Sequence, residues 1–175
     1  MKARALLTKM VDLHKAGTIA TGPNSHCYTA VINACVHCEN DDREMIKALQ
    51  ITIDTYKEIL DSEYDSPNQV TFSTTINALR NLMPPCEKRD AVIGAIFRKC
   101  AAAGHVEDFV IRRLQSSLST ERLRELLGAD AVSDDGRVDM DQLPSEWKRN
   151  ARLISSRRNE RASGQRQNGA QRQRP

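Results

Sequence analysis

Aromatic side chains are scarce in this sequence of 175 residues, and long apolar runs are absent from it. Phe, Trp and Tyr make up 4% of the chain, whereas charged residues make up 28%. So few aromatic residues argue against a β-sandwich, because strands are enriched in them. No apolar run approaches the roughly 18 residues that a membrane span needs. The length favours one domain, and we expect no membrane partner.

Cysteines are few and odd in number, and the sequence shows no secretory signal. The five cysteines cannot all pair with one another. We therefore expect reduced thiols in an intracellular compartment. The first ten residues read as an amphipathic helix without Ser, which is not typical of a transit peptide.

Catalytic and metal-binding motifs are also missing. The sequence contains no Ser/His/Asp, Cys/His or phosphate-loop pattern. Cys35 and Cys38 lack the second close pair of ligands that a structural zinc site needs. A calcium loop centred on Gly136 would begin and end at Ala131 and Gln142, which are not carboxylates. We expect no enzyme, no cofactor, no bound metal and no small-molecule substrate.

What the sequence does contain is helical periodicity, interrupted by Gly and Pro. Apolar residues recur at spacings of three and four, and no alternating strand pattern competes with them. The sequence predicts an all-α protein with helices over residues 1–16, 25–38, 42–60, 69–83, 88–103, 107–118 and 120–127.

Two of these helices repeat one another at an offset of 44 residues. Residues 23–34 read PNSHCYTAVINA and residues 67–78 read PNQVTFSTTINA. Pro, Asn, Ile, Asn and Ala are identical between the two segments, and Tyr28 and Thr29 correspond to Phe72 and Ser73. A second amphipathic helix follows each segment. Repeated helix pairs stack side by side, since one pair cannot bury its apolar faces alone.

The chain is thus predicted to have three parts. Residues 1–127 form a helical-repeat domain with a partial repeat (1–22), two repeats (23–66 and 67–108) and terminal helices (109–127). Residues 128–147 form an acidic loop and an anchor segment that ends at Trp147. Residues 148–175 form a disordered basic tail with nine Lys or Arg and one Glu, a net charge of +8, which leaves −5 for the rest. Such a tail can follow a phosphate backbone without sequence preference, and the basic residues nominated for it are Lys148, Arg149, Arg152, Arg157, Arg158 and Arg161.

The repeated segment resembles the pentatricopeptide repeat. The resemblance rests on Pro-Asn, an aromatic residue, Thr or Ser, and Ile-Asn-Ala in the first helix of each pair, and it covers roughly residues 1–108. The family period is close to 35 residues, whereas the period here is 44. The resemblance implies an α-solenoid that binds single-stranded RNA, in mitochondria or plastids, in RNA processing, stability or translation.

The resemblance also implies which residues contact RNA. The family reads about one base per repeat with an early residue of the first helix and the last residue of the repeat. These positions correspond to Thr29 with Asn68, and to Ser73 with Asp108. His26 and Val70 correspond to the positions that hold a base between neighbouring repeats.

Simpler roles stay open for the same residues. Asn68 is a good helix N-cap, Thr29 and Ser73 fit an ordinary polar helix surface, and Tyr28 and Phe72 fit packing between repeats. The first helix of each pair carries no acid, which removes a repulsion toward phosphate. The alternative function is a helical-repeat scaffold for other proteins. A measurement of RNA binding by the purified chain distinguishes the two functions.

Overall fold

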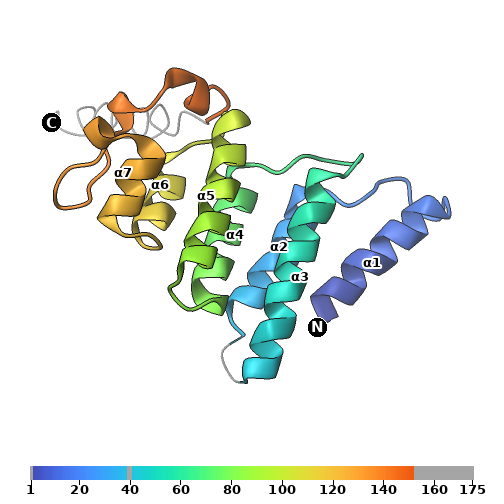
Figure 1. Cartoon of the computed structure of the whole chain (residues 1–175). Helices are drawn as coiled ribbons and strands as arrows, with labels where there is room; N and C mark the ends of the chain where they lie inside the picture. Colours follow the sequence, from blue (N-terminus) through green and yellow to red (C-terminus); the bar gives the residue numbers. More distant parts are fainter. Residues whose placement is uncertain (1, 39–40, 152–175) are drawn as a thin grey trace, which may run out of the picture.

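The computed structural model describes residues 2–38 and 41–151, and these residues are all-helical (Figure 1). The prediction of an all-α fold is confirmed for this part of the chain. Every predicted helix is present, with boundaries within three residues of those expected. The helices are α1 (Lys2–Lys15), α2 (Ser25–Val36), α3 (Asp42–Leu60), α4 (Gln69–Leu82), α5 (Glu87–Ala102), α6 (Asp108–Gln115) and α7 (Thr120–Leu127).

Local signals explain where these helices begin and end. Asn24, Asp41, Asn68 and Ser119 each cap a helix with a side-chain oxygen that accepts a backbone N–H. At α4 the cap is reciprocal, because the Thr71 side chain bonds back to the backbone of the cap residue. Glycines with positive φ follow α1, α5 and α7.

The helices form two layers (Figure 1). In one layer α4 packs against α2 on one side and against α6 on the other. In the other layer α3 packs on α2 and α4, and α5 packs on α4. The helix α1 lies at one end of the molecule and α7 at the other, so the layers run as an open row and do not close into a bundle.

The core lies between the two layers. Tyr28 and Phe72, which correspond in the two repeats, are each 1% exposed, and Ile32 and Ile76 are fully buried. The ring of Phe72 contacts the ring of Tyr56 from α3 edge to face, with centroids 6.3 Å apart. The expected packing role of Tyr28 and Phe72 is therefore confirmed.

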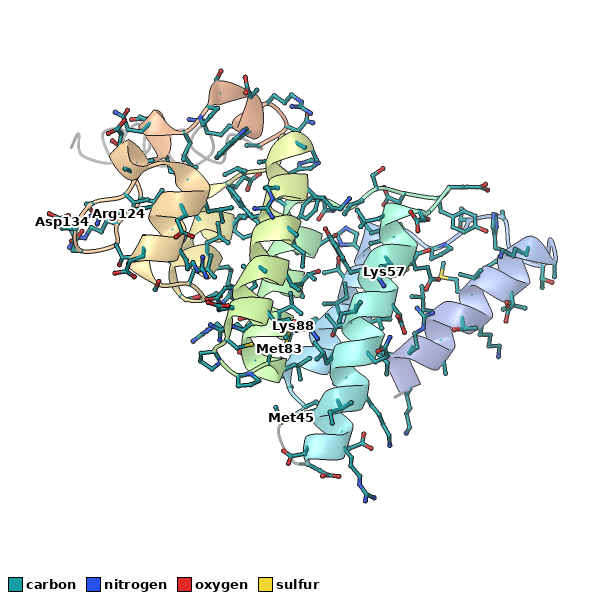
Figure 2. All side chains as sticks on the ribbon, in the orientation of Figure 1. Met45, Lys57, Met83, Lys88, Arg124 and Asp134 are labelled. Atoms are coloured by element: carbon teal, nitrogen blue, oxygen red, sulfur yellow. The ribbon has the colours of Figure 1, made fainter. Side chains whose placement is uncertain are left out.

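The segment after α7 folds back onto α5. This segment contains the short 3-10 turns Ala129–Ala131, Met140–Gln142 and Ser145–Lys148, and an isolated bridge pairs Val132 with Val138 between the first turn and the second. The backbone N–H of Val106 donates to the carbonyl of Trp147 at 2.9 Å, and the Trp147 ring contacts Phe97 edge to face at 5.6 Å. Figure 2 shows Arg124 of α7 beside Asp134 of the loop that follows this helix, and the two form an ion pair of 2.5 Å. Trp147 thus anchors this segment, as the sequence predicts.

No helix among residues 2–38 and 41–151 is long and apolar enough to cross a bilayer.

Candidate nucleic-acid interface

Three helices of one layer present corresponding residues in order. The helices α2, α4 and α6 begin at Ser25, Gln69 and Asp108, and they pack side by side. Counted from these starts, the fifth residues correspond to one another, and so do the second residues. The fifth residues are Thr29, Ser73 and Arg112; the second residues are His26, Val70 and Phe109.

Thr29 and Asn68, the first predicted pair of base readers, are brought together through Thr71. The hydroxyls of Thr29 and Thr71 lie 2.9 Å apart. The Thr71 hydroxyl also lies 3.3 Å from the amide oxygen of Asn68, which accepts the backbone N–H of Thr71 at 3.1 Å. Both predicted readers are half-buried and belong to one hydrogen-bond network at the N-terminal ends of α2 and α4.

Asn68 also connects two neighbouring helices. Its amide nitrogen donates to the hydroxyl of Ser25 at 3.1 Å. The backbone N–H of Ser25 donates to the carboxylate of Asp65 at 2.6 Å, and this bond lowers the pKa of Asp65. A carboxylate therefore lies at the start of α2, although the helix itself contains no acid. Asn68 has one amide hydrogen left for a further partner, because its amide carries two.

The two residues predicted to flank a base are accessible. His26 is exposed and the side chain of Val70 is 44% exposed. Phe109 stands at the corresponding position of α6 and is half-buried. Of these three side chains, Phe109 offers the larger aromatic face.

A cleft of about 410 Å³ lies between α4 and α6. Ser73 and Arg80 of α4 line one side of it, and α6 with the residue after it lines the other. Ser73 itself is only 5% exposed, so it sits deep in the molecule rather than on an open surface. The residues that line the cleft are Ser73, Arg80, Phe109, Arg112, Arg113 and Ser116.

The cleft is positively charged. Three arginines and no acid line it. Arg112 pairs with Asp108 at 3.1 Å, and both side chains of this pair are more than two-thirds exposed. Neither Arg80 nor Arg113 takes part in an ion pair among the residues that the structure describes. Asp108, predicted as the closing partner of Ser73, is therefore bound to an arginine at the start of α6.

Sequence reasoning missed this cleft because it did not treat α6 as a third member of the row. The spacing from α4 to α6 is 39 residues instead of 44, and residues 106–113 share no identical residue with 67–74. Only the apolar pattern persists, since Ile111 takes the place of Phe72 and both are buried. A search for apolar positions alone, without the Pro-Asn signature, finds this third unit.

Two basic residues nominated for the tail lie in the described part of the chain. The Lys148 ammonium donates to the carbonyl of Met140 at 2.6 Å, and the Arg149 guanidinium donates to the carbonyls of Glu146 and Ala102. Arg149 thus holds the last segment against the end of α5, whereas Lys148 ties together two parts of the last segment itself. The other nominated tail arginines, Arg152, Arg157, Arg158 and Arg161, lie outside the described residues.

No cluster of three or more His, Cys, Asp and Glu able to hold a metal occurs in residues 2–38 and 41–151. Burial raises the pKa of the Cys100 thiol to about 12, and it lowers the pKa of His105. Both effects suppress the charged form of the side chain.

Comparison with known proteins finds no matching family model, no matching curated protein and no matching solved structure.

Proposed function

We propose that this chain is a short α-solenoid of the pentatricopeptide kind that binds single-stranded RNA along α2, α4 and α6. The row of corresponding helices supports the proposal, because such rows present one set of residues per repeat to an extended ligand. The observation that carries it is the cleft between α4 and α6, where Phe109 lies among Arg80, Arg112 and Arg113.

The cleft has the two features that sequence-tolerant binding of single strands needs. A base stacks on an aromatic face for about 1–3 kcal/mol, and arginines contact the phosphates on either side. The arginine fork matches a phosphate with two parallel hydrogen bonds. The polar network of Thr29, Thr71 and Asn68 lies further along the same row and would contact the next nucleotides.

A biological role follows from the resemblance as part of the same proposal. Single-stranded RNA bound by such repeats is processed, stabilised or translated in mitochondria or plastids. The small number of repeats implies weak binding by the described residues alone, and the arginines of residues 152–175 would add contacts to phosphate.

Binding of labelled RNA at several salt concentrations tests the proposal. The variant Arg112→Ala/Arg113→Ala is compared with Arg43→Ala/Arg98→Ala, a control that removes the same charge from exposed sites outside the cleft. We expect the cleft variant to bind less tightly and to reduce the salt slope by roughly 1.4, at about 0.7 per phosphate contact on a single strand.

Equal slopes for the two variants would contradict binding in the cleft. Phe109→Ala distinguishes stacking from phosphate contact, because loss of about 1–3 kcal/mol of stacking lowers affinity by about 5- to 150-fold without changing the salt slope. No binding to any RNA pool would overturn the proposed function and favour the scaffold.

A further inference from the structure

An apolar groove of about 340 Å³ runs along the opposite layer, between α3 and α5. These two helices each pack on α4 more closely than on one another, so the α4 residue Leu79 forms part of the floor of the groove. Apolar side chains line its walls: Ile53 and Leu60 on α3, and Val92 and Ile96 on α5. Figure 1 shows the two helices running side by side in front of α4.

Among residues 2–38 and 41–151, the charged side chains that line this groove are both lysines. Lys57 stands on the α3 side and Lys99 on the α5 side, and both are exposed. Figure 2 shows Lys57 on α3.

Three acids of the same two helices bond to residues other than these lysines. The carboxylate of Asp54 accepts from Gln50, Glu58 pairs with Arg4 of α1, and Asp90 pairs with Arg89. Neither Lys57 nor Lys99 forms an ion pair with any residue of the described chain. An apolar groove edged by unpaired positive charge is complementary to an apolar ligand edged by negative charge.

The length of the groove matches a helix. Its lining residues span Ile53 to Leu60 on α3 and Val92 to Lys99 on α5. Each span is two helical turns, roughly 10 Å at 1.5 Å per residue. Apolar anchors at positions i, i+4 and i+7 of a docked helix cover the same distance.

We propose that this groove binds an amphipathic helix of a partner protein, with three apolar anchors flanked by Asp or Glu. The basic tail of this chain does not fit the groove, since residues 152–175 contain seven Arg and one Glu, and Lys57 and Lys99 repel that charge. The proposal is independent of RNA binding, because the groove and the cleft lie on opposite layers.

A labelled helical peptide of about 15 residues, with Leu at i, i+4 and i+7 and Glu beside them, tests the proposal by fluorescence anisotropy. A second peptide carries Lys in place of each Glu. The full chain should bind the acidic peptide and bind the basic one at least tenfold more weakly. The double variant Lys57→Glu/Lys99→Glu should reverse this preference, whereas Lys2→Glu/Lys9→Glu on α1 is the matched control and should retain it.

A second variant tests the groove independently, in case the first variant does not fold. Ala95 lines the groove and is exposed, so Ala95→Trp should fill it and abolish binding of the acidic peptide while leaving the helical circular dichroism unchanged. Equal binding of both peptides, or binding that survives Ala95→Trp, would overturn the proposal. A dimer in solution that Ala95→Trp converts to monomer would also overturn it, because a second copy would then be the occupant. Loss of RNA binding in the arginine variants has no bearing on these outcomes.

Discussion

At the scale of single residues, Asn68 shows why a base-reading role and a structural role are difficult to separate. Its amide oxygen caps α4 and its amide nitrogen bonds to Ser25 at the start of α2. Asn24 occupies the corresponding position in the previous repeat, and among the residues that the structure describes its side chain accepts the N–H of Cys27 and makes no other hydrogen bond. The same residue type thus has a different number of partners in the two repeats.

Replacing Asn68 with Ala should lower the free energy of unfolding by about 2 kcal/mol, because a cap is worth about 1 kcal/mol and a buried hydrogen bond about as much. Asn24→Ala is the control and should cost about 1 kcal/mol. Urea unfolding followed by circular dichroism measures both. Equal losses would show that the bond to Ser25 contributes nothing to stability.

One of the cleft arginines differs in chemistry from the corresponding residues of the first two repeats. Arg112 takes the position that Thr29 and Ser73 hold in the first two repeats, so the third unit has an exposed charge where the first has a half-buried hydroxyl and the second a buried one. Neutral hydroxyls favour contact with base edges, whereas guanidinium groups favour phosphate. Under the proposed function, the two ends of the row would make different kinds of contact with RNA.

At the scale of elements, the glycines that end the helices differ in what surrounds them. Gly17 after α1 and Gly104 after α5 both have φ near +70°, at 70° and 74°. A Cβ at Gly17 would contact nothing within 4 Å, whereas a Cβ at Gly104 would collide with the side chain of Arg149. Gly104 therefore meets two requirements, the backbone conformation and the close approach of the last segment.

Gly17→Ala should lower the free energy of unfolding by about 1 kcal/mol, because it places a Cβ in the left-handed region of backbone conformation. Gly104→Ala should cost about 2 kcal/mol, because Arg149 must also move and its bonds to the carbonyls of Ala102 and Glu146 weaken. Thermal unfolding of the two variants gives the comparison. If Gly104→Ala destabilises the protein no more than Gly17→Ala does, the side chain of Arg149 moves away from the new Cβ without a cost in stability.

At the scale of the whole molecule, the open row of helices places α4 at the centre of the contacts. It packs on α2, α3, α5 and α6, whereas α1 packs mainly on α2, and α7 on α6 and the turn after it. In a row of this kind stability arises between neighbours, so the ends open more readily than the middle.

Native-state amide hydrogen exchange should follow this order. Protection is expected to be greatest in α4 and least in α1 and α7, with α2 and α5 between them. Measurement by mass spectrometry on the full chain gives the protection of each helix. Uniform protection across all seven helices would indicate one cooperative unit and contradict a row of weakly coupled pairs.

The sequence by itself determined the helices and the relation between the first two repeats. Periodic apolar residues, caps and glycines are local signals, and the similarity of residues 23–34 to 67–78 follows from direct comparison of the two segments. The pairing of Thr29 with Asn68 came from the resemblance to the pentatricopeptide repeat, and the structure links the two side chains through Thr71. The predicted packing of Tyr28 and Phe72 followed from their shared position in the repeat.

Only the tertiary structure decided what the molecule presents on its two layers. The cleft among Arg80, Phe109 and Arg113 exists because α6 packs on α4, a contact between segments whose sequences no longer match. The groove edged by Lys57 and Lys99 exists because α3 and α5 both lean on α4 and leave space between them. Such sites depend on the distance between helices, and helix periodicity does not encode that distance.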